Sequence, residues 1–81
     1  MQILINLLEQ KEHVLIYSFG SESSGMDGVF SINLQDINQS KIEKMPLDNS
    51  LYLSYVNKAM AKVMRLLLKG EVPEQIEYCS C

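Results

Sequence analysis

Few side chains in this 81-residue chain could carry out catalysis. Acid–base or nucleophilic catalysis needs a base that is held beside its partner and oriented by a third group. His13 is the single histidine, it follows Glu12 at the expected start of a strand, and no G-x-S-x-G motif accompanies it. Because a surface histidine explains this position more simply, we predict a protein that is not an enzyme and uses no cofactor.

The two cysteines, Cys79 and Cys81, lie two residues apart at the end of the chain. A disulfide between them would close a small, strained ring, so we expect reduced thiols. A structural zinc ion takes four ligands, and two such tails meeting in a dimer would supply four thiolates. Metal binding through Cys79 and Cys81 is therefore an alternative function, although we expect no bound metal.

The glycines cluster in residues 20–28, which a phosphate-binding loop could also show. The segment lacks the lysine of a phosphate-binding loop, does not open a helix, and holds Glu22 and Asp27, which would repel an anion. We predict a connector between two antiparallel strands. Whether it binds a protein is left open.

Positive charge is concentrated in one short segment. The formal charge is −4 over residues 1–57, +4 over 58–69 and −3 over 70–81. Four cations share one face of a helix: Lys58, Lys62, Arg65 and Lys69. Such a face could follow a phosphate backbone, so a nucleic-acid-binding accessory protein is an alternative function. The net charge of −3 argues against nucleic acid in general, and an acidic protein or solvent fits this face equally well.

A helix over residues 49–69 would position these cations. Residues with N-capping oxygens follow Pro46, Gly70 suits the left-handed position after the helix, and Pro73 prevents its continuation. The apolar face is formed by Leu53, Val56, Met60, Val63 and Leu67. Further apolar residues widen this face to roughly 200°, more than one sheet would cover. The excess predicts a further partner.

Strand-like patterns precede the helix. We expect strands over residues 2–8, 13–19, 28–34 and 41–45, with polar turns at 9–12 and 35–40. The first ten residues also fit a helical stripe, and we interpret them as a strand. The C-terminal segment, 70–81, could add a fifth strand. The predicted fold class is α+β: one domain, residues 1–81, with a small, mostly antiparallel β-meander of three to five strands and one long amphipathic C-terminal helix packed on one face.

The order of sequence features along the chain resembles the order found in a group of bacterial proteins. The features are a hairpin, a glycine-containing loop, the strand Gly28–Asn33, a helix ending in Lys-Gly, and the segment Val72–Glu74. Together they are similar to small uncharacterised proteins of Gram-positive bacteria and their mobile elements. The resemblance implies a strand at the N-terminus and assigns no functional residue.

The expected strands carry more apolar surface than one helix can bury. In strand 13–19 both sides are apolar, and the N-terminal strand repeats the pattern. We predict an interface formed by Leu15, Tyr17, Phe19, Leu66 and Leu68. Through it the chain would form a homodimer by sheet faces or helix flanks. In the alternative, the C-terminal segment closes the second face through Ile76 and Tyr78.

The expected function is therefore a non-enzymatic interaction module that self-associates, as an accessory or regulatory protein with an unidentified protein partner. No basic residue precedes the apolar run at the N-terminus, so a secretory signal is not expected. No apolar run is long enough to span a membrane. We expect a cytoplasmic bacterial protein without a membrane partner.

Overall fold

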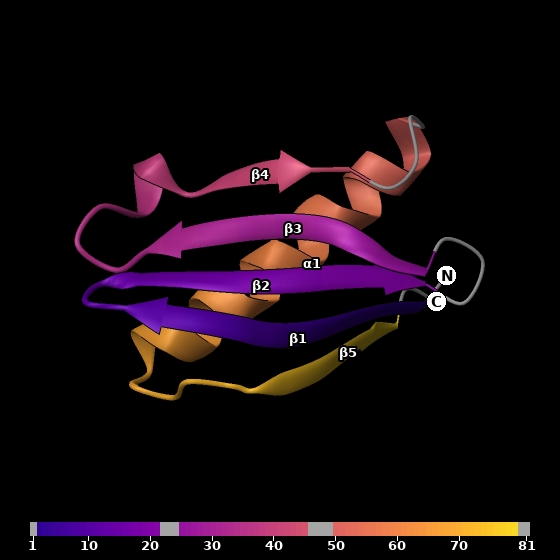
Figure 1. Ribbon diagram of the computed structural model, residues 1–81. Helices are drawn as coiled ribbons and strands as arrows, with labels where there is room; N and C mark the ends of the chain where they lie inside the picture. The colour runs from indigo at the N-terminus through magenta and orange to yellow at the C-terminus, as the bar shows by residue number, and fades with distance from the viewer. Residues whose placement is uncertain (1, 22–24, 46–49, 80–81) are drawn as a thin grey trace.

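The computed structural model describes residues 2–21, 25–45 and 50–79, which form one antiparallel sheet of five strands and one α-helix (Figure 1). The elements in chain order are β1 (Gln2–Lys11), β2 (Val14–Ser21), β3 (Gly25–Asn33), the 3-10 helix η1 (Ile37–Gln39), β4 (Lys41–Lys44), α1 (Ser50–Leu68) and β5 (Gln75–Cys79). The strand order across the sheet is β4-β3-β2-β1-β5. The predicted α+β class, with a meander of antiparallel strands, is confirmed.

The helix is not the C-terminal element, which corrects the prediction. It links β4 to β5, which lie at opposite edges of the sheet, and it crosses one face diagonally (Figure 1). β5 then pairs antiparallel with β1, from Gln2 opposite Cys79 to Asn6 opposite Gln75. The segment after the helix thus extends the sheet and leaves its second face open.

The core lies between α1 and the face of the sheet that α1 crosses. Its buried residues alternate along the strands and recur at helical spacing in α1, as a two-layer fold requires. From the sheet they are Ile3, Ile5, Leu15, Tyr17, Phe19, Phe30 and Ile32, and from α1 they are Tyr52, Val56, Ala59, Met60, Val63 and Leu67. The ring of Phe30 lies 5.4 Å from that of Tyr17 and 5.6 Å from that of Phe19, centroid to centroid. One layer of aromatic and branched side chains therefore holds the central strands to the helix.

The strands extend further than their patterns predict. β1 continues through the expected turn to Lys11, which pairs with Val14, and the hairpin turns at Glu12, where φ is +49°. The register of β1 against β2 shifts between Leu7 and Glu9, which marks a β-bulge at Leu8. Likewise β2 and β3 both extend into the expected connector, leaving residues 22–24 outside the described part.

The end of α1 follows the predicted signals. Gly70 has φ of +87°, the amide of Gly70 donates to the carbonyl of Leu67, and the amide of Glu71 donates to that of Leu66. This pair of bonds is the Schellman motif, which satisfies carbonyls at a helix end. The expected N-capping residues before Ser50 lie outside the described residues.

Tyr17 ties the α1–β5 connection to the sheet. Its hydroxyl donates a hydrogen bond of 2.9 Å to the carbonyl oxygen of Pro73, and its side chain is fully buried. Burial raises the pKa of the Tyr17 hydroxyl to about 12, because the phenolate would lose its hydration. In the part of the chain that the structure describes, no helix is long and apolar enough to cross a membrane.

Candidate interaction surface

The predicted interface residues separate into two groups. Leu15, Tyr17 and Phe19 have no exposed surface, because α1 covers the side of β2 from which they project. These three residues pack into the chain's own core and offer nothing to a partner. Leu66 is partly buried, and Leu68 is 74% exposed at the end of α1.

The opposite face of the sheet, here called the open face, carries apolar side chains of its own. Its members alternate with the buried residues along the three central strands, and their cross-strand partners are polar or glycine. They are Leu4, Leu8, Val14, Ile16 and Val29, here called the open-face cluster. Leu8 is 60% exposed and the other four are partly buried. Hydroxyl and amide side chains fill the rows between them, among them Ser18, whose hydroxyl donates to the Asn6 carbonyl at 3.5 Å.

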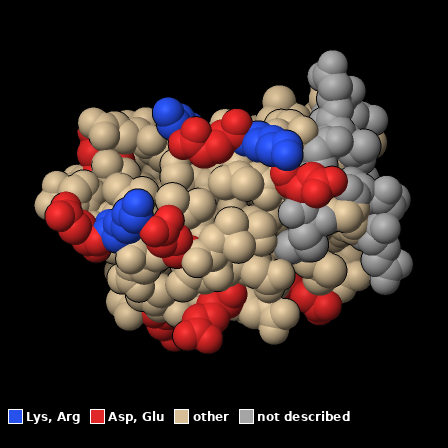
Figure 2. Space-filling view, in the orientation of Figure 1, with Lys and Arg blue, Asp and Glu red and all other residues tan. Residues whose placement is uncertain are grey.

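Charges lie at the margins of the open face. Figure 2 shows it with acidic and basic side chains along β4, at the end where β1 turns into β2, and along β5, while the middle is uncharged. On β4, Lys41 pairs with Ser31 and Lys44 pairs with Val29, which places both lysines on this face. On β5, Glu77 pairs with Leu4 on the same face. The β4 edge therefore carries two lysines with the Glu43 carboxylate between them, and the β5 edge carries Glu77 (Figure 2).

The C-terminal segment does not close this face. Ile76 pairs with Ile5 and Tyr78 with Ile3, and Ile5 and Ile3 belong to the core under α1. Both C-terminal side chains pack against that same core. The alternative, in which Ile76 and Tyr78 shield the second face, is thus wrong.

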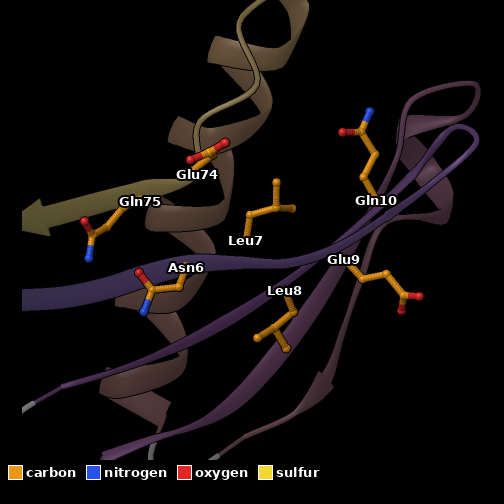
Figure 3. Close-up of a pocket in the computed structure, with 7 residues that line it drawn as sticks. All are labelled: Asn6, Leu7, Leu8, Glu9, Gln10, Glu74 and Gln75. Carbon is orange, nitrogen blue, oxygen red and sulfur yellow. The ribbon is translucent and has the colours of Figure 1, made fainter.

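A hollow of about 460 Å³ lies beside β1 where β5 begins. The amide of Leu7 donates to the carbonyl of Glu74 at 2.8 Å, and beyond this bond β1 continues to Lys11 without pairing to β5. Figure 3 shows Leu8 and Glu9 on one side of β1 and Leu7 on the other, as a bulge produces. The bulge turns Glu9 toward the open face and adds to its charged margin.

The four predicted cations, here called the basic stripe, lie on the outer side of α1. Lys62 donates from Nζ to the carbonyl of Glu77 at 3.3 Å, and Lys58 Nζ lies 6.0 Å from the ring centroid of Tyr55. Arg65 and Lys69 are exposed. Within the described ranges the ion pairs involve Lys11, His13 and Lys41, and none involves the stripe. The stripe is therefore a surface of uncompensated positive charge.

Beside the stripe, two hollows join into a groove along α1, here called the α1 groove. The first, about 450 Å³, is lined by Ser50, Leu53, Ser54, Asn57, Lys58 and Ala61. The second, about 280 Å³, is lined by Ser40, Lys41, Ile42, Asn57, Met60, Ala61 and Met64. They share Asn57 and Ala61, and the second lies between α1 and β4. The sequence predicts the apolar flank of α1 but not the part that β4 contributes, because that depends on how the helix crosses the sheet.

The remaining candidates are dispersed. His13 stands at the β1–β2 turn, with Nδ1 4.0 Å from a Glu12 carboxylate oxygen. Cys79 is exposed at the end of β5, and Cys81 lies outside the described residues. No group of three or more histidine, cysteine or acidic side chains within residues 2–21, 25–45 and 50–79 could hold a metal ion.

No family model, curated protein or solved structure matches this chain. The resemblance to small proteins of Gram-positive bacteria therefore stays a prediction, and the candidate surfaces stand on their geometry.

Proposed function

We propose that this protein is an interaction module that pairs with a second copy of itself through the open face of its sheet. The observation that carries the proposal is the open-face cluster, which projects from the central strands on the side that α1 leaves uncovered. Apolar groups that gather in the middle of a surface and are rimmed by charge are typical of an interface. Nothing in this role requires catalysis.

The charges of the open face favour a second copy as the occupant. A two-fold axis that runs parallel to the strands, between two facing sheets, would lay β4 of each copy over β5 of the other. Through Val29, Ser18 and Asn6, Lys44 is level with Gln75 on the open face, so Lys44 of each copy would lie two residues, about 7 Å along the strand, from Glu77 of its partner. Each copy would make the same contact twice, which is the condition for a closed dimer.

The open face is also large enough for a dimer interface. The overall extents are 32 × 22 × 20 Å, so one face spans roughly 600–700 Å² in projection, near the ~800 Å² per partner of a standard interface. A dimer that packs α1 of one copy against α1 of the other is less favourable, because residues 50–69 contain four cations and no acid. Two such helices side by side would repel each other.

The experiment is light scattering over a range of concentrations, on the parent protein and on a charge-swap series. We expect twice the chain mass of 9.2 kDa at micromolar concentration. Lys44→Glu and Glu77→Lys should each weaken the dimer at least tenfold, and the double variant should recover most of the loss, because the pair is restored in reverse order.

The control is Lys69→Glu, a charge reversal at the end of α1, which should leave the dimer unchanged. A parent protein that stays at 9.2 kDa up to about 1 mM contradicts the proposal. A dimer that is insensitive to the swap series but is lost in Lys69→Glu would place the contact on the helix instead.

A further inference from the structure

We infer that the α1 groove binds an acidic amphipathic helix from another protein. The groove is a second surface on the side of the molecule that carries α1, so this inference is independent of pairing through the open face. It concerns a partner of different chemistry from the chain itself.

The shape and lining of the groove indicate a helix. Its apolar lining residues are Leu53, Met60, Ala61 and Met64 from α1 and Ile42 from β4, and small polar residues, Ser40, Ser50, Ser54 and Asn57, line it as well. From Ser50 to Met64 the groove follows α1 for about 21 Å, which is close to four helical turns. Methionine side chains adapt to different apolar partners, and an amphipathic helix is the usual occupant of such a groove.

The charge of the groove indicates an acidic occupant. Two cationic residues line it, Lys58 and Lys41. The Lys41 ammonium group lies 3.8 Å from the carboxylate of Glu43, which also accepts from Ser31 of the open face, so Lys58 is the cation that the groove itself presents. Arg65 extends the positive field along the same helix, whereas Lys69 lies beyond the groove, and no acid lies within residues 50–69. Carboxylates along the flanks of a partner helix would meet these cations.

Two other occupants fit less well. A second α1 would bring its own cations against those of the first, and its sequence has no acid to offset them. A nucleic acid gains most from a track of free cations and stacking aromatic rings. Here Lys58 lies beside aliphatic and methionine side chains rather than in such a track, and Lys62 is already bonded to the carbonyl of Glu77.

The test uses a synthetic helical peptide with leucine on one face and glutamate on both flanks. It is titrated into isotopically labelled protein and followed by amide chemical shifts. We expect changes in α1 and β4 and none in β1. Lys58→Glu, inside the groove, should weaken binding at least tenfold, while Lys69→Glu, the same change on the same helix beyond the groove, should alter it less than twofold.

Two comparison ligands make the outcome decisive: the same peptide with lysine in place of glutamate, and a duplex DNA of about 20 base pairs. The inference predicts no binding of the lysine peptide and no saturable binding of the DNA at moderate salt. It is overturned if the glutamate peptide leaves the α1 signals unmoved at millimolar concentration, or if both peptides bind equally. It is also overturned if DNA binds and loses affinity equally in Lys58→Glu and Lys69→Glu, since that result assigns the stripe to nucleic acid.

Discussion

Tyr17 shows how a single hydroxyl fixes the return of the chain from helix to sheet. The residue is buried beneath α1, yet its hydroxyl reaches the carbonyl of Pro73 in the α1–β5 connection. A buried hydroxyl must find such a partner or lose free energy. Tyr17 therefore links the core to the segment that sets the position of β5.

This contact predicts how stability depends on pH. Burial raises the pKa of Tyr17 to about 12, above the value near 10 of a tyrosine in the unfolded chain. The folded state therefore holds the proton more tightly. The contribution of Tyr17 is complete below pH 10 and disappears as the pH rises from about 10 to 12. Over that window we expect the parent protein to lose about 2 to 3 kcal/mol more than Tyr17→Phe.

Urea unfolding measured at about pH 8 and pH 11 checks this expectation. At pH 8 the Tyr17→Phe variant should be less stable by about 1 kcal/mol, the net value of one hydrogen bond. Equal losses of stability in the two proteins between these pH values would show that Tyr17 does not stay protonated in the fold.

At the scale of elements, Gly28 and Gly70 are required for two different reasons: backbone conformation at Gly70 and close side-chain contact at Gly28. Gly70 has φ of +87° and an added Cβ would meet nothing within 4 Å. Gly28 lies opposite Phe19, and an added Cβ would overlap the Phe19 ring, at 2.5 Å from its nearest atoms. Gly70→Ala should cost about 1 kcal/mol through the backbone alone. Gly28→Ala should cost about 1 to 3 kcal/mol through overpacking.

The two cases are distinguished by adding Phe19→Leu, which removes the ring over Gly28. In a double-mutant cycle by urea unfolding, Phe19→Leu should offset part of the Gly28→Ala loss and none of the Gly70→Ala loss. Equal coupling energies in the two cycles would mean that Gly28 is restricted by its backbone rather than by Phe19.

Local patterns predict most of the elements but not their arrangement. Period-two alternation locates β3 and β4, β-branched and aromatic content locates β2, and Gly70 with Pro73 locates the end of α1, because these signals depend on neighbouring residues. The pattern of β1 fits a helix as well as a strand. The bulge at Leu8 has no such signal, since Glu9, Gln10 and Lys11 read equally well as a polar turn. The position of the helix between β4 and β5 depends on pairing across the whole sheet, which a local pattern does not encode.

At the scale of the whole molecule, the sequence predicts the excess of apolar surface but assigns it to the wrong side of β2. Both sides of that strand are apolar, and only the packed structure shows that α1 covers Leu15 and Tyr17 while Ile16 stays on the open face. The alternation of apolar residues alone does not choose between two apolar faces. The choice follows from the larger aromatic side chains, which bury more area under the helix.

The layout of the sheet predicts an order of local opening. β2 is paired on both sides, whereas β4 and β5 each pair on one side. In native-state hydrogen exchange we expect the amides of β2 to exchange slowest and those of β4, the shortest strand at four residues, to exchange fastest among the strands. Equal protection across all the strands would show that the sheet opens only as a unit.

The pairing of Gln2 with Cys79 has a mechanical consequence. These residues lie side by side on antiparallel strands at one end of the sheet, where β1 begins and β5 ends (Figure 1). A pulling force applied between Gln2 and Cys79 would break the hydrogen bonds between β1 and β5 one after another. This is the unzipping geometry, in contrast to shear, which loads all the bonds at once. Under tension the protein would therefore yield by peeling β5 away first, which releases the far end of α1 before the meander is disturbed.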